Sequence, residues 1–212
     1  MNPIRIFVVD DHAIFRCGLA ALVAHEPSLA WAGEATTAEE ALRCAVTRLP
    51  DVLLLDMVMP GCSSLALLER LKRELPHTRV LALSCTVDGA NARAALDAGV
   101  AGYLLKLTTP QDMLRAIHAA MEGRRVVSPA VIEAIDKADR AARLGAALTE
   151  RERCLLALMA RGLPNQTISE RMQIGVPTVK FHVTNILSKL QADNRPAAVL
   201  KALRLQLVAL EP

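Results

Sequence analysis

The chain has 212 residues, of which 52% are hydrophobic and 22% are charged, and it contains only five aromatic residues. This composition predicts a globular protein with an aliphatic core and excludes wholesale disorder. The apolar runs are far shorter than the roughly 18 residues of a membrane span, so we expect no membrane partner. The five cysteines form no Cys-x-x-Cys pair, which argues against a disulfide framework or a zinc site and favours a cytoplasmic location.

The formal net charge of +3 is unevenly distributed along the chain. Residues 1–128 carry 13 basic and 14 acidic side chains, whereas residues 129–212 carry 12 basic and 8 acidic side chains. A near-neutral first part followed by a small basic part indicates an anionic partner for the second part.

In the first 122 residues, short aliphatic runs alternate with longer stretches that have the period of a helix. We expect strands at 4–9, 29–32, 52–55, 80–83 and 102–105, and helices near 13–25, 38–48, 64–75, 88–98 and 110–122. Five strand–helix units in series predict a doubly wound (βα)5 domain of the α/β class around a parallel sheet. Strands that are apolar throughout, such as 52–55, are typical of a sheet covered on both faces.

From about residue 128 the strand pattern disappears, and the rest of the chain predicts helices and turns. We expect a linker helix at 130–143, a hinge at 144–147, and further helices at about 150–160, 165–172, 177–190 and 196–209. The predicted organisation is therefore an α/β domain at 1–124, a linker with a helix at 125–147, and a small all-α domain at 148–212.

Polar side chains stand at the carboxyl ends of the predicted strands, where open α/β sheets bind their ligands. Asp10 and Asp11 follow the first strand, Asp56 the third, Ser84 the fourth and Lys106 the fifth. Three converging carboxylates indicate a hard divalent cation, Mg²⁺ or Mn²⁺. A carboxylate beside such an ion can attack phosphorus and form an aspartyl phosphate, to which Ser84 and Lys106 are suitable donors. The alternative is a set of ordinary turn and helix-cap residues.

The helices at 165–172 and 177–190 have the proportions of a helix-turn-helix. The apolar stripe of the second helix consists of Val179, Val183, Ile186 and Leu190. Its opposite face presents Phe181, Thr184, Asn185 and Ser188, flanked by Lys180 and Lys189. Short hydrogen-bonding side chains between cations suit the major groove of DNA. The alternative is a merely solvated face, but such a face gains nothing from an outward Phe181, whereas contact with a thymine methyl group explains it.

These motifs together resemble a two-component response regulator of the NarL/FixJ type. The first domain is similar to a receiver domain in Val8-Val9-Asp10-Asp11-His12, Leu53-Leu54-Leu55-Asp56-Met57-Val58-Met59-Pro60-Gly61, Ser84 and Gly102-Tyr103-Leu104-Leu105-Lys106. The second is similar to a LuxR-type helix-turn-helix in Leu148-Thr149-Glu150-Arg151-Glu152, the stretch 162–172, Thr178-Val179-Lys180-Phe181-His182, Ile186-Leu187-Ser188-Lys189-Leu190 and Asn194-Arg195.

The resemblance implies roles for the residues at the sheet edge. Asp56 is the implied phospho-acceptor, Asp11 a direct metal ligand, Asp10 a ligand through water, and the backbone carbonyl of Val58 a further ligand. Tyr103 matches the family's switch aromatic, which is expected to turn inward as Ser84 engages the phosphoryl group. His12 and His182 are expected to be structural rather than chemical.

The implied partners are a sensor histidine kinase and double-stranded promoter DNA, which the protein binds as a homodimer. The expected DNA-contact residues are Asn165, Gln166, Thr178, Lys180, Phe181, Thr184, Asn185, Ser188 and Lys189. The protein is thus expected to be a regulator rather than an enzyme, although its receiver is able to catalyse its own phosphorylation and dephosphorylation. The helix at 196–210 has an apolar arc too wide for one small core, which favours a symmetric dimer contact.

Two positions depart from the family pattern, and two other functions compete with this interpretation. Leu107 stands where many relatives have an acidic residue, and Gly175-Val176-Pro177 replaces a serine cap and polar residues. A phosphohydrolase of the haloacid dehalogenase type also uses an aspartyl phosphate. Its chemistry requires a second acidic residue two positions after the nucleophile, where this chain has Val58. The other alternative is an interaction module whose helical domain binds protein rather than DNA.

Overall fold

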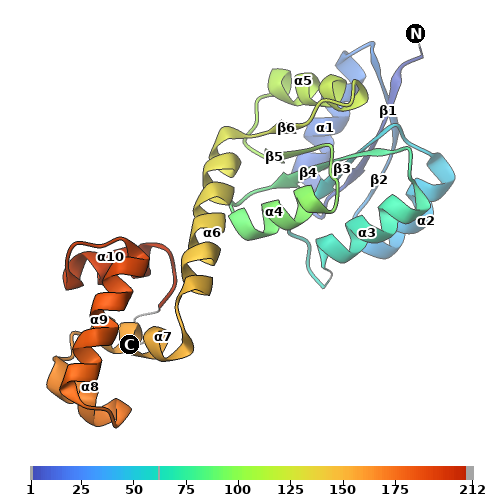
Figure 1. The fold of residues 1–212 in the computed structure, drawn as a ribbon. Helices are drawn as coiled ribbons and strands as arrows, with labels where there is room; N and C mark the ends of the chain where they lie inside the picture. The colour runs from blue at the N-terminus through green and yellow to red at the C-terminus, as the bar shows by residue number, and fades with distance from the viewer. Residues whose placement is uncertain (1, 62, 209–212) are drawn as a thin grey trace. The chain divides into compact units, whose positions relative to one another are not determined.

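The computed structural model describes residues 2–61 and 63–208 (Figure 1). The chain divides between Ile135 and Asp136 into two compact units. The predicted linker at 125–147 spans this division, with its first part in the first unit. No helix within the described ranges is long and apolar enough to cross a lipid bilayer.

The first unit is an α/β domain built on a fully parallel sheet. Its strands are β1 (Ile4–Val9), β2 (Leu29–Ala35), β3 (Val52–Asp56), β4 (Arg79–Ser84), β5 (Gly102–Leu105) and β6 (Val126–Val127), in the order β2-β1-β3-β4-β5-β6. Its helices are α1 (Ala13–His25), α2 (Ala38–Arg48), α3 (Ser64–Glu74), α4 (Gly89–Asp97), α5 (Pro110–Met121) and the start of α6 (Pro129–Ala147). The predicted doubly wound fold is confirmed, whereas β6 is an addition to the five expected strands.

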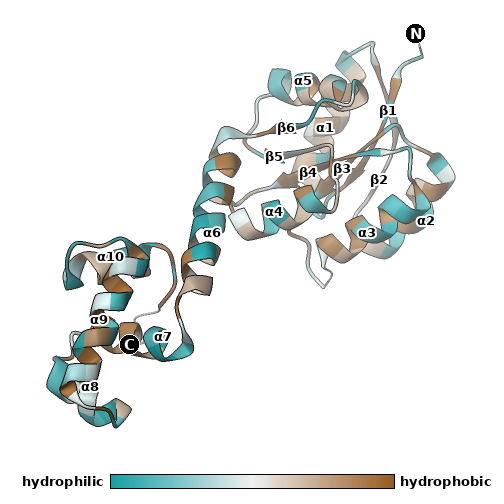
Figure 2. Cartoon of the chain, viewed as in Figure 1, coloured by the Kyte–Doolittle hydropathy of each residue, from teal (hydrophilic) through white to brown (hydrophobic). Residues whose placement is uncertain are grey.

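The helices cover both faces of the sheet and create two hydrophobic layers. Side chains of α2, α3 and α4 pack on one face, and those of α1 and α5 pack on the other. The central strands β3 and β4 are hydrophobic over 52–55 and 80–83, with polar residues only at their ends (Figure 2). Residues 52–55 are fully buried, as the prediction of a sheet covered on both sides requires.

Strand β6 and the first turns of α6 extend the first unit beyond α5. Val126 and Val127 pair in parallel with Gly102 and Tyr103 of β5. Val131 and Ile135 of α6 are buried in the core layer that contains Tyr103. The start of the predicted linker is thus part of the α/β domain.

The second unit is entirely helical, as predicted. It contains the end of α6, α7 (Glu150–Ala160), α8 (Asn165–Met172), α9 (Val176–Leu190) and α10 (Arg195–Arg204). Thr149 and Glu152 form a reciprocal capping box at the start of α7. The core includes Leu155, Leu156, Met159, Ile168, Val179, Ile186, Leu190, Ala198 and Ala202.

Two expectations about the second unit are wrong. The segment 144–147 is not a hinge, because α6 continues as a helix through Ala147 and Leu144 packs on the helical core. The last helix ends at Arg204 rather than near residue 209, and Gln206 has a left-handed backbone with φ of 55°. Leu207 and Val208 pack against the same core, so part of the expected apolar excess is covered within the unit. Residues 209–210 lie outside the described part of the chain.

Candidate functional sites

The carboxyl ends of the parallel strands bring the predicted acidic residues together. Val9 of β1 lies opposite Leu55 of β3, so Asp10 and Asp56 follow at the same level of the sheet. This is also the point where the strand order reverses, which is the usual ligand-binding position of a doubly wound sheet. Asp10 and Asp56 are buried, whereas the Asp11 side chain is 29% exposed.

Lys106 places a positive charge between the two buried carboxylates. Its Nζ atom lies 2.7 Å from Oδ2 of Asp10 and 2.7 Å from Oδ2 of Asp56. The side chain donates a hydrogen bond to Asp56. Its contact with Oδ2 of Asp10 is an ion pair, and among the described residues this oxygen has no hydrogen-bond partner. Burial acts to lower the pKa of Lys106, but the attraction of Asp10 and Asp56 raises it overall.

Burial raises the pKa of the Asp56 carboxyl above its ordinary value, although Lys106 and the Val58 backbone amide oppose the shift. The Val58 amide donates to Oδ1 of Asp56 over 2.9 Å. Asp56 thus combines a buried side chain with fixed donors on both of its oxygens. A buried carboxylate held in one orientation is suited to accept a group that arrives from the open side of the sheet edge.

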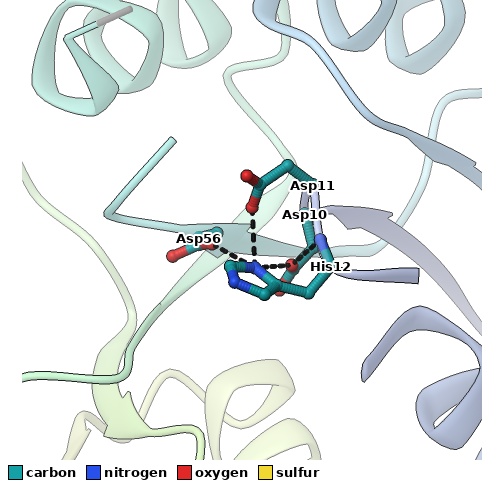
Figure 3. Close-up of side chains that lie close together, drawn as sticks. All are labelled: Asp10, Asp11, His12 and Asp56. Atoms are coloured by element: carbon teal, nitrogen blue, oxygen red, sulfur yellow. Dashed lines mark hydrogen bonds and ion pairs between the residues drawn. The ribbon is translucent and has the colours of Figure 1, made fainter. Parts of the chain in front are cut away.

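His12 directs its ring into the same group of carboxylates (Figure 3). Its Nδ1 atom lies 2.7 Å from Oδ1 of Asp11, 3.2 Å from Oδ1 of Asp10 and 3.8 Å from Oδ2 of Asp56. The candidate ligand atoms of these four residues all lie within 4.8 Å of one another. His12 was expected to be structural, and only its position next to Asp11 in the sequence could have signalled this placement.

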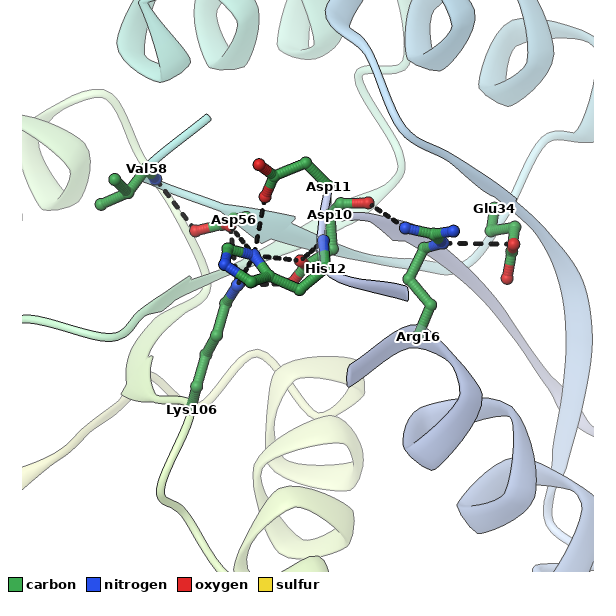
Figure 4. A network of polar contacts seen from close by, with 8 residues as sticks. All are labelled: Asp10, Asp11, His12, Arg16, Glu34, Asp56, Val58 and Lys106. Atoms are coloured by element: carbon green, nitrogen blue, oxygen red, sulfur yellow. Dashed lines mark hydrogen bonds and ion pairs between the residues drawn. The ribbon is translucent and has the colours of Figure 1, made fainter. Parts of the chain in front are cut away.

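Arg16 supports the acidic residues from α1 (Figure 4). Its guanidinium donates to the backbone oxygen of Asp10 over 2.9 Å and to the Glu34 carboxylate over 3.2 Å. These contacts connect the end of β1 to α1 and β2. Sequence reasoning missed Arg16, because a helical arginine gives no sign of which carbonyl it contacts.

Ser84 and Tyr103 lie beside the acidic site, at β4 and β5. The Ser84 hydroxyl donates to the Thr86 carbonyl over 2.8 Å, so it is used locally in this structure. Tyr103 is buried, with 1% of its surface exposed, and its ring belongs to the same core layer as Val131. Burial raises the pKa of the Tyr103 hydroxyl, while the Ser84 side chain acts in the opposite direction. The Tyr103 side chain therefore already points inward in this structure.

In the second unit, α8 and α9 form the expected helix-turn-helix. Val179, Ile186 and Leu190 are fully buried, and Val183 is partly buried. The opposite side of α9 faces outward, with Phe181 62% exposed. The exposed members of the predicted DNA-contact set are Gln166, Thr178, Lys180, Phe181, Thr184 and Ser188, and Asn185 is partly buried.

Two predicted DNA-contact residues have partners inside the helical unit. Lys189 donates to Glu152 of α7 over 2.6 Å, and Asn165 accepts from Arg195 over 2.8 Å. Glu152 is buried, so the Lys189 ammonium neutralises a charge that has little access to water. Both pairs fix helices against one another, which the sequence could not indicate because the partners are 37 and 30 residues apart.

The two units match two known families. Residues 6–118 match the response regulator receiver domain, and residues 146–202 match the LuxR family of bacterial regulatory proteins. The chain therefore belongs to the two-component response regulators that combine a receiver with a LuxR-type DNA-binding domain. Members of this class are regulators rather than classical enzymes.

Named relatives cover nearly the whole chain. The sequence is 36% identical over 204 residues to the nitrate/nitrite response regulator protein NarL of Escherichia coli K12, with 94% of each chain covered. It is 34% identical over 206 residues to the response regulator protein VraR of Staphylococcus aureus NCTC 8325, with 97% of this chain and 99% of VraR covered. The identification as a NarL/FixJ-type regulator is confirmed.

Solved structures agree with this assignment. The response regulator ChrA of a heme-sensing two-component system is 32% identical, with a TM-score of 0.57 and coverage of 98% of this chain and 100% of ChrA. RcsB of Salmonella typhimurium, described for its conformational dynamism in DNA interaction, is 25% identical, with a TM-score of 0.65 and coverage of 94% of this chain and 98% of that one.

Proposed function

We propose that Asp56 accepts a phosphoryl group from the phosphohistidine of a sensor kinase and that the phosphorylated protein then binds promoter DNA. The observation that carries the proposal is the buried carboxylate of Asp56, which lies among two further aspartates and the Lys106 ammonium. A cluster of carboxylates fits Mg²⁺ or Mn²⁺, and Oδ2 of Asp10, which pairs with Lys106 but receives no hydrogen bond from the described residues, is a further oxygen for such an ion or its water.

In the proposed transfer, a carboxylate oxygen of Asp56 attacks the phosphorus, and the bond from phosphorus to the kinase imidazole breaks. The imidazole nitrogen leaves with the electron pair. Lys106 is already within 2.7 Å of the attacking carboxylate, so its ammonium can pair with the phosphoryl oxygens. The Ser84 hydroxyl can donate to the same oxygens once it releases the Thr86 carbonyl.

Asp10, Asp11, Asp56 and the backbone carbonyl of Val58 are the proposed metal-binding groups. A bound divalent cation supplies positive charge that offsets the repulsion between the carboxylates and the incoming phosphoryl group. The Arg16 contact holds the backbone of Asp10 in place for this role. Lys106, whose raised pKa keeps it charged, contributes further positive charge.

For DNA binding, we propose that α9 enters the major groove with its exposed face. Lys180 would contact phosphate, while Phe181 and Thr184 would reach base edges. The remaining proposed contacts are Gln166, Thr178, Asn185 and Ser188. Because Lys189 and Asn165 have internal partners, we assign them to the support of α9 and α8 rather than to the groove.

We also propose that two copies pair on DNA through α10, in the cytoplasm. Leu200 of α10 is 50% exposed, although its neighbours Ala198 and Ala202 are buried in the helical core. A two-fold pair of helix-turn-helix units would place its half-sites about one helical turn apart. Four free thiols, Cys17, Cys44, Cys85 and Cys154, fit a reducing compartment, whereas Cys62 lies outside the described residues.

The decisive experiment is phosphorylation of the purified chain by acetyl phosphate, with and without Mg²⁺. Wild-type protein is expected to gain one phosphoryl group by intact mass, and only when the cation is present. Asp56→Asn is expected to remain folded and unlabelled, because the amide is a poor nucleophile of the same shape. Asp97→Asn, an exposed residue of α4, is the matched control and should label normally. Equal labelling of Asp56→Asn would overturn the assignment.

A further inference from the structure

His12 stands at the entrance to α1, and its ring contacts the neighbouring carboxylates: Nδ1 shares a hydrogen bond with Oδ1 of Asp10 over 3.2 Å and lies 2.7 Å from Oδ1 of Asp11. His12 occupies the N-cap position of that helix, but its side chain makes no capping hydrogen bond. The ring is not part of the core either, because 57% of the side-chain surface is exposed. Its backbone amide donates to Oδ1 of Asp10 over 2.8 Å, which fixes the residue beside the carboxylates.

The position of the imidazole fits that of a metal ligand. Ligands at adjacent corners of an octahedron with bonds of about 2.1 Å are about 3 Å apart. The Nδ1 atom of His12 lies 2.7, 3.2 and 3.8 Å from oxygens of Asp11, Asp10 and Asp56. One cation could therefore contact Nδ1 and the carboxylates with small adjustments of side-chain torsions. Lys106 Nζ lies 3.4 Å from Nδ1, so this ring nitrogen faces the same polar site as the carboxylates.

We propose that His12 is a nitrogen ligand of the cation site at Asp10, Asp11 and Asp56, and that it shifts the preference of this site from Mg²⁺ toward first-row transition cations. The inference rests on the proposed phosphoryl-acceptor site. Carboxylates and water suit Mg²⁺ and Mn²⁺, whereas an imidazole ligand favours later metals such as Co²⁺ and Ni²⁺. His12 is thus a residue that determines metal selectivity rather than a phosphoryl acceptor.

The test is calorimetric titration of the full chain with Mg²⁺, Mn²⁺ or Co²⁺ alone. Any site with N or O ligands binds Co²⁺ more tightly than Mn²⁺, so the diagnostic quantity is the change of the Co²⁺/Mg²⁺ affinity ratio on substitution. For His12→Phe we expect the Co²⁺ affinity to fall at least about tenfold. Removing a residue that only hydrogen-bonds to a metal ligand already costs about tenfold or more, so loss of a ligand should cost no less. The Mg²⁺ affinity should change little.

Two variants separate metal ligation from effects on folding. His12→Asn places an amide oxygen near the position of Nδ1, so it should keep Mg²⁺ binding and lose the preference for Co²⁺. His77→Ala removes an exposed histidine in the loop between α3 and β4 and should leave every affinity unchanged. Nitrogen modulation in the electron spin echo of bound Mn²⁺ should be present in wild type and His77→Ala and absent in both His12 variants.

The outcomes distinguish this inference from the proposed function. If wild-type protein binds none of the three cations, the proposed phosphoryl-acceptor site itself fails. If wild type binds them and His12→Phe weakens all three equally, or weakens none, His12 is not a ligand while the acidic site stands. A gain of affinity for all three in His12→Phe would mean that the imidazole competes with the cation, and it would also overturn the inference.

Discussion

The Nζ atom of Lys106 lies 2.7 Å from Oδ2 of Asp56, although the two residues are 50 positions apart in the sequence. Parallel pairing of β3, β4 and β5 brings them together, since each follows or ends a strand at the same edge. The ammonium also lies 2.7 Å from Asp10. The Lys106 ammonium therefore compensates the charges of two buried carboxylates that would otherwise repel each other.

The first prediction concerns this compensation. Lys106→Met leaves Asp10 and Asp56 as uncompensated buried neighbours, so we expect the free energy of unfolding without metal to fall by about 3 kcal/mol. Mg²⁺ should bind the variant more tightly by about 1 kcal/mol, roughly fivefold, because the ammonium no longer repels it. Urea unfolding with and without Mg²⁺ measures both effects.

The control for Lys106 is Lys72→Met in α3. Lys72 donates to the Gly99 carbonyl at the opposite end of the strands, over 2.6 Å. Its removal should affect stability equally with and without Mg²⁺. The prediction fails if Mg²⁺ stabilises Lys106→Met no more than it stabilises the wild type.

The second prediction concerns the contact of α4 with α6. A Cβ atom added at Gly89 would lie 2.1 Å from the backbone oxygen of Ala134, which is far inside van der Waals contact. Gly89→Ala is therefore expected to displace α6 and to lower the free energy of unfolding by about 2 kcal/mol, within the usual range for overpacking. Hydrogen exchange should accelerate at 129–135, where Val131 and Ile135 are buried.

Gly18→Ala in α1 is the matched control. A Cβ atom at Gly18 meets nothing within 4 Å, and alanine favours the helix by about 1 kcal/mol. This variant should be at least as stable as wild type, with unchanged exchange at 129–135. If Gly89→Ala behaves in the same way, the close approach of α4 and α6 is not a real constraint.

The third prediction concerns Glu152 and Lys189. Burial acts to raise the pKa of Glu152, but hydrogen bonds from Lys189 and Thr149 lower it below its ordinary value. A depressed carboxyl pKa stabilises the fold at neutral pH, and this stabilisation is lost as the pH falls below the ordinary value of 4.5. We expect Glu152→Gln to flatten the acid side of the stability profile of the helical unit.

Glutamine can still complete the capping box, so Glu152→Gln isolates the charge from the cap. Lys189→Met should lower the free energy of unfolding by about 1–3 kcal/mol at neutral pH, the scale of a hydrogen bond to a charged group. Glu150→Gln, an exposed change in the same helical turn, is the control. The measurement is hydrogen exchange of residues 148–190 between about pH 3 and 7, because carboxyl groups titrate in this range. An unchanged acid profile in Glu152→Gln would contradict the pairing.

The periodicity of the sequence predicted most elements because each is long enough to show its period. Val126 and Val127 escaped prediction because a two-residue strand has no period, and it forms only where β5 offers an open edge. The continuity of α6 through Gly145 was missed because glycine weakens a helix locally, whereas packing of Leu144 on the helical core supports it.

The acidic site was predictable because strand ends in a parallel sheet share one edge. The strand assignment alone was enough to place Asp10, Asp56 and Lys106 at the same edge of the sheet. The roles of Lys189 and Asn165 were not predictable, because an exposed position on a helix does not show which residue of another helix lies above it. Their partners, Glu152 and Arg195, are set by how α7, α8 and α10 pack around α9.

The last prediction separates residues that contact DNA from residues that support α9. Lys180 is exposed and has no ion pair among the described residues, so Lys180→Ala should weaken binding to every duplex and reduce the salt slope by about 0.9. The Thr184 hydroxyl donates to the Lys180 carbonyl over 3.1 Å, and its oxygen can still accept from a base edge. Thr184→Ala should therefore alter base preference, by about 1–3 kcal/mol at the contacted position.

Lys189→Ala supplies the comparison, because it removes a positive charge from the same helix. If Lys189 serves Glu152 rather than phosphate, this variant should reduce the folded fraction but leave the salt slope of the folded protein unchanged. Fluorescence anisotropy on random duplexes at several salt concentrations measures the slopes, and enrichment from a randomised duplex library measures base preference. Equal slope losses in Lys180→Ala and Lys189→Ala would show that Lys189 reaches the phosphates after all. Identical enriched sequences for Thr184→Ala and wild type would remove Thr184 from the base-reading face.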